Sequence, residues 1–272
     1  MSGVSGVSGV SGVSGSASFE QLIAEGAAEP VDGWDFSWLA GRATEERPAW
    51  GYAGLLAGRL AGARAALDLQ TGGGEVLAGA LARAARRPPD IAVTESWPPN
   101  AGLARRRLAP FGATVHQVAD DAGLPFPDAS FDLVTSRHPT VTVWPEIGRV
   151  LAPGGAYLSQ QIGAGTNREL YEFMMGPQPA SPASRVQLAV AAAGAAGLEV
   201  TDLREQALRV EFFDVGAVVY FLRKVLWTVP GFTVEGYRDQ LARLHEVIQA
   251  EGRFTCHAQR FLIEARRPPA RA

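Results

Sequence analysis

Cysteine and lysine are almost absent from this chain of 272 residues, and each absence excludes a class of chemistry. The lone cysteine, Cys256, cannot form an internal disulfide or a cysteine zinc site, so a reducing compartment is the simplest expectation. Lys224 is the lone lysine, and all the other basic residues are arginines. We therefore do not expect a mechanism that uses a thiol nucleophile or a lysine Schiff base.

The chain also lacks an excess of positive charge, a long apolar run and a spacing of histidines typical of metal sites. The formal net charge is −3 and the pI is near 5.9, which argues against a general nucleic-acid binder. The longest apolar stretches, such as residues 215–222, are far shorter than the ~20 residues of a membrane helix. No secretory signal is visible, and the four histidines lack metal-ligand spacing, so we predict a cytoplasmic protein without a metal.

The first residues contain the triplet Ser-Gly-Val four times and carry no charge. Gly/Ser-rich sequence of this kind behaves as a flexible coil, so we predict that residues 1–18 form a disordered tail. Residues 19–272 are predicted to form one domain, although the chain length alone suggests about two. Helical spacing of apolar residues predicts that this domain begins with a helical cap over residues 19–64.

From Ala65 onward, short apolar runs alternate with helical patterns. Alternation of this kind predicts right-handed crossovers and a parallel sheet with helices on both faces. The predicted fold is α/β, a three-layer Rossmann-like arrangement with a mostly parallel, seven-stranded sheet. The expected strands begin at Ala65 and otherwise cover residues 88–96, 113–119, 131–138, 156–163, 207–213 and 254–265.

The turn after the first of these strands combines Asp68 with three glycines, Gly72, Gly73 and Gly74. Glycines allow a backbone to adopt positive φ and to approach a ligand closely, and the helix that follows offers free N–H groups. Glu95 ends the next strand, and Asp120 ends the one after it. A single acid at a strand end is often a helix cap, but three successive ones predict a ligand site at the carboxyl edge of the sheet.

These features resemble the class I S-adenosylmethionine-dependent methyltransferases, and among them the methyltransferase type 11 group. The resemblance covers roughly residues 67–163, where the matching stretches are LDLQTGGGE, Glu95, DDAGLPFPDASFDLV and EIGRVLAPGG. It implies S-adenosylmethionine as the cofactor. The Gly-x-Gly-x-x-Gly pattern of dinucleotide-binding oxidoreductases is absent, because Leu77 stands where its third glycine is required.

The resemblance also implies a role for each residue of the turn and the strand ends. Asp68 and the backbone of Gly72–Gly74 would hold the methionine end of the cofactor, and Glu95 would bind the ribose hydroxyls. Asp120 would contact the adenine amino group, with a neighbouring N–H from Asp121. The family pattern has glycine where this chain has Gln70, whose side chain would either crowd the methionine carboxylate or form a hydrogen bond with it.

Residues at the end of the fourth predicted strand are the catalytic candidates. His138 is the candidate base that faces the substrate, and Arg137 could pair with a carboxylate of the cofactor or the substrate. We also count Ser136 among the cofactor-binding candidates. For each of them the alternative is a structural hydrogen bond or a surface ion pair.

We expect an enzyme that methylates a small organic molecule, with no membrane or nucleic-acid partner. Residues 65–165 would be the cofactor-binding half, and residues 166–272 would include substrate-lid helices at about 214–250. Aromatic residues of the cap and lid are candidate substrate walls: Trp34, Trp38, Trp50, Tyr52, Phe212, Phe213, Tyr220, Phe221, Trp227 and Tyr237. The alternatives are an rRNA or tRNA methyltransferase and a cofactor-binding protein that does not methylate.

Overall fold

The computed structural model describes residues 17–31, 35–179 and 184–270. Most of the predicted tail, residues 1–16, and the candidate wall residue Trp34 lie outside this part of the chain. Ser18 lies inside it and caps the first helix, α1 (Phe19–Ala28), because its hydroxyl accepts a hydrogen bond from the Gln21 N–H at 3.3 Å. The first helix that the structure describes is therefore capped at its N-terminus.

One sheet of eight strands forms the centre of the described structure, in the order β1-β7-β8-β6-β5-β2-β3-β4. The five strands from β6 to β4 in this order are parallel, whereas β8, β7 and β1 join by antiparallel pairing. The strands are β1 (Ala43–Glu45), β2 (Ala65–Leu69), β3 (Asp90–Glu95), β4 (Thr114–Gln117), β5 (Phe131–Arg137), β6 (Leu151–Ile162), β7 (Glu199–Phe212) and β8 (Phe254–Arg266).

The predicted α/β class and the mostly parallel sheet are confirmed, but the predicted strand number is wrong. The additional strand is β1, which lies inside the segment that we expected to be a helical cap. It has three residues, too few for an alternating pattern, and it forms by pairing with β7 more than 160 residues later in the chain. The helix α6 (Arg168–Met175) was also not predicted.

Helices cover both faces of the parallel part of the sheet. The first face carries α2 (Tyr52–Gly62), α3 (Glu75–Arg83) and α4 (Pro98–Leu108), which bury Leu56, Leu81 and Leu108 against the strands. The second face carries α5 (Trp144–Val150) and α7 (Arg185–Ala195). Burial of these apolar side chains is the main favourable contribution to folding and fixes which face each strand residue occupies.

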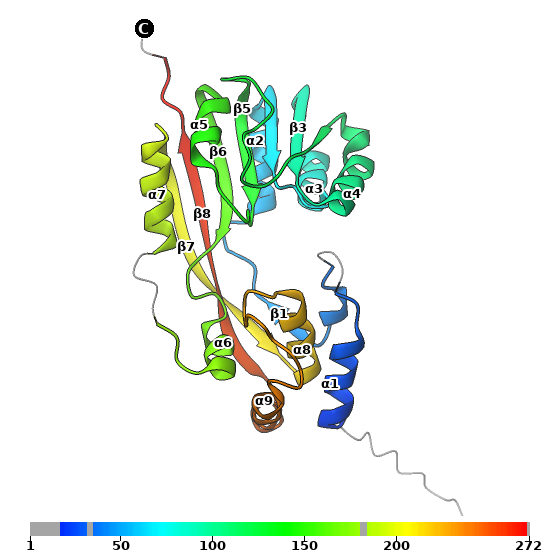
Figure 1. Cartoon of the computed structure of the whole chain (residues 1–272). Coiled ribbons are helices and arrows are strands. Elements are labelled where there is room, and N and C mark those ends of the chain that lie inside the picture. Colours follow the sequence, from blue (N-terminus) through cyan, green and yellow to red (C-terminus); the bar gives the residue numbers. More distant parts are fainter. Residues whose placement is uncertain (1–16, 32–34, 180–183, 271–272) are drawn as a thin grey trace, which may run out of the picture.

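The remaining helices gather around the far ends of β7 and β8, which extend beyond the end of β6 (Figure 1). They are α1, α6, α8 (Val215–Lys224) and α9 (Arg238–Glu251). With β1 and the extended ends of β7 and β8, we call them the accessory lobe. The two helices predicted between the last two strands are thus present, and they bury Val218, Leu222 and Leu244 in a core of their own. Their role as a substrate lid stays a prediction.

Backbone contact between two glycines holds α1 against α8. A Cβ added to Gly26 would lie 2.3 Å from the carbonyl oxygen of Gly216, and one added to Gly216 would lie 2.4 Å from that of Leu22. Backbone atoms cannot move aside as a flexible side chain can, so only glycine allows the two helices to approach this closely.

We expect Gly26→Ala to lower the free energy of unfolding by about 1–3 kcal/mol, because the two helices must separate. Gly58→Ala is the matched control, since an added Cβ on this α2 residue meets no atom within 4 Å. Better helix propensity should make that variant more stable by about 0.5–1 kcal/mol. Urea unfolding followed by circular dichroism measures both, and equal effects would contradict the contact.

Candidate cofactor and substrate site

The loop that follows β2 turns back over the ends of β2 and β3. Gln70, Gly72 and Gly74 all have left-handed φ angles, +53°, +63° and +79°. The Gln70 N–H donates to Thr94 Oγ1 at 3.2 Å, and the Gly72 N–H donates to Glu95 Oε2 at 2.8 Å. Residues at the end of β3 therefore hold the turn in place before α3 begins.

Arg107 fixes the same turn from the side of α4. Its guanidinium donates to the carbonyl oxygen of Gly73 and to the Glu75 carboxylate. A Cβ on Gly73 would lie 2.5 Å from that carboxylate and 2.9 Å from the guanidinium, so a side chain there would displace these two flexible groups. Arg105 and Arg106, the other members of this basic run, are exposed in the last turn of α4.

Glu95 is the last residue of β3, and its carboxylate is buried, with 6% of the residue exposed. One oxygen accepts the Gly72 N–H, and the other accepts the Trp97 N–H at 3.0 Å. A carboxylate oxygen has two lone pairs, so each one keeps a free acceptor position for a ligand hydroxyl. The residue expected to bind ribose thus also stabilises the glycine turn.

Asp68 lies within β2 and is buried, and its Oδ1 accepts a hydrogen bond from Thr135 Oγ1 at 2.6 Å. Burial raises the pKa of this carboxyl to about 6, against the lowering effect of the Thr135 and Thr71 hydroxyls. The Thr71 hydroxyl lies beside the carboxylate but makes no hydrogen bond of ordinary geometry with a described residue. Asp68 is therefore a buried carboxyl that is costly to ionise, and the Thr71 hydroxyl lies beside it at the start of the turn.

The raised pKa of Asp68 predicts a pH-dependent cost in stability. Its folded-state pKa lies above the usual 3.8, so its favourable contribution is complete below pH 3.8 and is lost as the pH rises through 6. We expect Asp68→Asn to be more stable than the wild type at pH 8 by about 1–3 kcal/mol and to show no such gain at pH 4. Urea unfolding at both pH values measures this difference, and parallel stability curves would contradict the assignment.

The Gln70 side chain points across the strand ends to the segment that follows β5. Its Nε2 donates to the carbonyl oxygen of Val141 at 2.6 Å, and its Oε1 accepts from the Thr140 N–H at 2.7 Å and from Thr140 Oγ1 at 3.0 Å. Thr140 Oγ1 also contacts the carboxylate of Asp120. The family's glycine position is thus occupied by an amide that bridges to Thr140 and Val141, and through Thr140 it is connected to Asp120, the acid expected at the adenine.

Asp120 lies three residues beyond the end of β4 and not at the strand end itself, and Asp121 beside it is exposed. A small cavity of about 20 Å³ lies between β2 and this loop. Its lining residues are Leu69, Gln70, Thr94, Ala119, Asp120, Ala122, Leu124, Val141 and Val143. The structure therefore brings Asp68, Gln70, Glu95 and Asp120 to one edge of the sheet, and Gln70 and Asp120 line the small cavity there.

Arg149 connects the two stretches that carry the most specific part of the family resemblance. Its guanidinium donates to the carbonyl oxygens of Phe126 at 2.7 Å and Leu124 at 3.0 Å, and to Asp128 at 2.9 Å. It also pairs with Glu146 on α5 at 2.7 Å. These carboxylates raise the pKa of the Arg149 guanidinium. The RVL segment thereby holds the LPFPD loop against the sheet, next to Asp120.

Ser136 is buried near the end of β5, where it lies opposite Leu69 of β2. Its hydroxyl forms hydrogen bonds with Tyr157 Oη at 2.7 Å and Ser159 Oγ at 2.9 Å, and its carbonyl oxygen accepts the Tyr52 hydroxyl at 2.9 Å. In this geometry the Ser136 hydroxyl belongs to a buried cluster of hydroxyl groups. Its assignment to the cofactor stays a prediction.

His138 follows β5 directly and has a left-handed φ of +54°. The Trp50 indole N–H donates to Gln160 Oε1 at 2.8 Å, so the Gln160 amide directs its Nε2 to His138 Nε2 at 2.9 Å. His138 Nε2 is then an acceptor, and the ring proton is assigned to Nδ1 from this network. Burial, together with the nearby Arg137 and Arg260 charges, lowers the pKa of His138 to about 3.

This network changes what His138 can do. A neutral imidazole with its Nε2 already bonded is a weak proton acceptor at neutral pH, and it presents an N–H donor at Nδ1. Removal of a substrate proton, the role expected from the sequence, is therefore not favoured by its surroundings. Arg137, in contrast, is exposed, and its guanidinium forms no hydrogen bond or ion pair with any residue that the structure describes.

Threonines are the site residues that sequence reasoning missed. Thr94, Thr135 and Thr140 each use a hydroxyl to contact the turn, Asp68 or Asp120. Thr94 and Thr135 lie near the ends of predicted strands, and this position could have indicated that they belong to the site. Their hydroxyls supply the hydrogen bonds that buried or strained backbone and carboxylate groups require.

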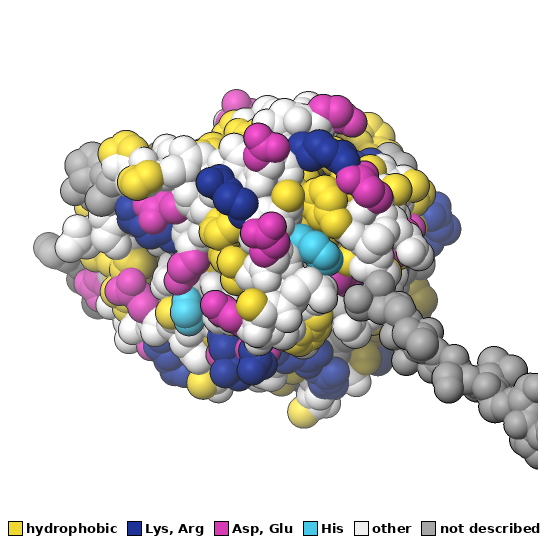
Figure 2. Space-filling model, turned by 90° about the horizontal axis from the view of Figure 1, so that it is seen from below, with side chains coloured by type: hydrophobic (Ala, Val, Ile, Leu, Met, Phe, Trp, Pro, Cys, Tyr) yellow, Lys and Arg dark blue, Asp and Glu magenta, His cyan; other side chains and the backbone are white. Residues whose placement is uncertain are grey.

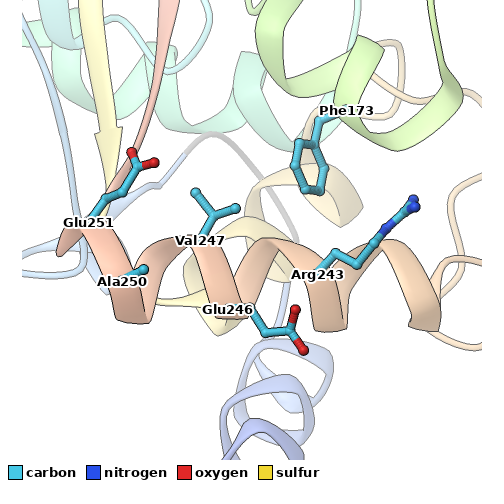
Figure 3. A pocket seen from close by; sticks show the side chains of 6 residues that line it. All are labelled: Phe173, Arg243, Glu246, Val247, Ala250 and Glu251. Carbon is cyan, nitrogen blue, oxygen red and sulfur yellow. The ribbon is translucent and has the colours of Figure 1, made fainter.

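A larger hollow lies elsewhere, between α6 and α9 in the accessory lobe (Figure 3). It measures about 610 Å³ and is lined by one residue of α6 and five of α9: Phe173, Arg243, Glu246, Val247, Ala250 and Glu251. None of these residues belongs to the predicted site. Its size alone assigns no ligand to it.

Across residues 17–31, 35–179 and 184–270, no three histidine, cysteine, aspartate or glutamate side chains are grouped so as to hold a metal ion. In the same part of the chain, no helix has both the length and the apolar character that crossing a bilayer requires.

Comparison with known proteins gives one family match and several similar solved structures. Residues 67–159 match the family model described as a methyltransferase domain. No protein of curated function matches the chain.

Among the solved structures, the YcgJ protein of Bacillus subtilis is 19% identical, with a TM-score of 0.56 over 80% of this chain and 99% of that one. A functionally unknown protein of Deinococcus radiodurans R1 is 17% identical, with a TM-score of 0.53 over 83% and 90% of the two chains. A candidate methyltransferase of Bacillus halodurans C-125 is 19% identical, with a TM-score of 0.52 over 75% and 92%.

Identities this low establish the shared fold and nothing finer. The family match covers β2 through most of β6, and so includes the glycine turn, Glu95, Asp120 and the loop held by Arg149. The resemblance to the class I S-adenosylmethionine-dependent methyltransferases is therefore confirmed for residues 67–159, the segment that matches the model of a methyltransferase domain.

Proposed function

We propose that this chain uses S-adenosylmethionine to methylate a small organic molecule. The observation that carries the proposal is the edge of the sheet in the matched domain. Asp68, Glu95 and Asp120 lie there together, around a turn with left-handed glycines. Ligands of open α/β sheets bind at this edge, and acids at these positions suit the hydroxyl and amino groups of an adenosyl cofactor.

The polar groups of the site fit this cofactor, whereas the space does not fit it while Gln70 keeps its present contacts. Asp68 and the backbone of Gly72–Gly74 would hold the methionine end, and the Thr71 hydroxyl is an available donor beside them. Glu95 would accept ribose hydroxyls, and Asp120 would accept the adenine amino group. The cofactor supplies an electrophilic methyl group on a sulfonium. The protein's contribution is alignment of the acceptor, which can supply several kcal/mol.

The acceptor side would be formed by the end of β5 and its neighbours. His138, neutral and held by Gln160, would orient an acceptor through its Nδ1–H. Arg137 is the exposed cation at the same strand end and would attract a negatively charged substrate group. Both roles are alignment roles, in agreement with a reaction that needs little covalent help.

The surface supports a small molecule over RNA. Figure 2 shows basic side chains along the lower edge of the face seen from below, and acidic and hydrophobic side chains over much of the rest of that face. Within the basic run of α4, Arg107 is used internally by Gly73 and Glu75. A chain with net charge −3 lacks the electrostatic footprint of most RNA-binding proteins.

We expect Glu95→Ala to weaken S-adenosylmethionine binding at least tenfold, through loss of the ribose acceptor and of the anchor of the Gly72 N–H. Isothermal titration calorimetry measures the affinity. Glu205→Ala is the matched control, since this exposed residue lies on β7, away from the turn. Normal binding by Glu95→Ala would refute the ribose assignment.

A separate labelling experiment distinguishes the proposed methylation of a small molecule from the two alternative functions. Transfer of a tritiated methyl group to a metabolite extract, and not to RNA, is the outcome that the proposal requires. Labelled RNA would support the rRNA or tRNA alternative. Cofactor binding without transfer to either fraction would support a protein that binds the cofactor but does not methylate.

A further inference from the structure

Gln70 occupies a backbone conformation that residues other than glycine rarely adopt, and its side-chain amide forms hydrogen bonds through both its nitrogen and its oxygen. With φ at +53°, its amide donates to Val141 and accepts twice from Thr140. Two of these contacts are with backbone groups, the Thr140 N–H and the Val141 carbonyl oxygen, so the side-chain amide pairs with this segment as the backbone of an adjacent strand would. A residue with a strained backbone persists only where other contacts offset the free-energy cost of the strain. At Gln70 these contacts are its hydrogen bonds to Thr140 and Val141 in the segment that follows β5.

Thr140 extends this attachment to the other end of the expected cofactor site. Its hydroxyl lies within hydrogen-bonding reach of Gln70 Oε1 and of the Asp120 carboxylate. A hydroxyl has one proton, so it donates to one of these acceptors at a time. The residue expected at the methionine end and the residue expected at the adenine end are thus linked through one side chain.

The linked residues leave almost no room between them. The cavity that they line measures about 20 Å³, whereas pockets for small ligands typically enclose about 300–1,000 Å³. A space of about 20 Å³ is sufficient for about one water molecule. The contacts of Gln70 with Thr140 and Val141 therefore leave little space between Gln70 and Asp120.

We propose that Gln70 is a latch that keeps the cofactor site closed until the cofactor displaces its side chain from Thr140 and Val141. This inference rests on the proposed function. Because Thr140 and Val141 follow His138 by two and three residues, release of the latch also frees the segment that carries the acceptor-side residues. Gln70 thus lowers cofactor affinity and couples cofactor binding to the conformation of the substrate side.

Substitution of the latch should raise affinity for the product form of the cofactor, S-adenosylhomocysteine, used here as the probe. We expect Gln70→Gly to bind it at least tenfold more tightly than the wild type in calorimetric titration, because binding no longer has to break the hydrogen bonds of Gln70 with Thr140 and Val141. Gln70→Ala, which removes the amide but keeps a Cβ, should gain part of this increase.

Ala129→Gly is the matched control, because Ala129 has a similar left-handed φ of +56° but lies in an exposed loop outside the latch. Relief of backbone strain alone would act in both variants, so unchanged affinity in Ala129→Gly assigns the gain to the latch. Hydrogen exchange supplies a readout independent of affinity. The Thr140 N–H should be protected in the free wild type and should exchange faster in Gln70→Gly or with the probe bound.

The outcomes separate the latch from the function on which it rests. Tighter binding by Gln70→Gly alone supports the latch. Equal or weaker binding by Gln70→Gly, with measurable binding by the wild type, overturns the latch and leaves the proposed function intact. No binding by either protein at millimolar probe overturns the proposed function and the latch with it.

Discussion

The site depends on one set of hydrogen bonds, those by which the end of β3 holds the turn that follows β2. Thr94 and Glu95 accept backbone N–H groups of residues 70–72, so the turn cannot leave the sheet without exposing a buried carboxylate. Parallel pairing of β2 with β3 and β5 brings these groups to the same edge. The positions of α3, of Asp120 and of the segment after β5 all follow from this anchored edge.

Three residues at this edge of the sheet have features that lower the stability of the fold. Asp68 is a buried carboxyl with a pKa raised to about 6, and Gln70 and His138 are left-handed residues without the freedom of glycine. Each feature costs folding free energy, and all three lie within or beside the matched domain's glycine turn. Departures from local rules are expected to gather where a protein binds or positions a ligand. The well-packed clusters around α2–α5 and in the accessory lobe compensate for these costs.

Local patterns were sufficient to predict the parallel strands, the helices α8 and α9, and the acids at the sheet edge. Asp68 and Glu95 could be predicted as residues of the sheet edge because each follows a short apolar run, and the end of such a run is visible in the sequence. The strand β1 could not be found, because it forms only by pairing with β7. The direction of the Gln70 side chain depends on a φ angle, and the state of His138 depends on Trp50 and Gln160, which are far away in sequence. Such long-range contacts have no signature in a single sequence.

A crystal structure of the wild-type chain with S-adenosylhomocysteine would test the central claim most directly, namely that the cofactor binds at the edge anchored by Glu95 and displaces Gln70. The account predicts the ribose hydroxyls on the Glu95 carboxylate, with the Gln70 amide separated from Thr140 and Val141. Ligand density in another place, such as the hollow between α6 and α9, or an intact Gln70 bridge beside a bound cofactor, would contradict it.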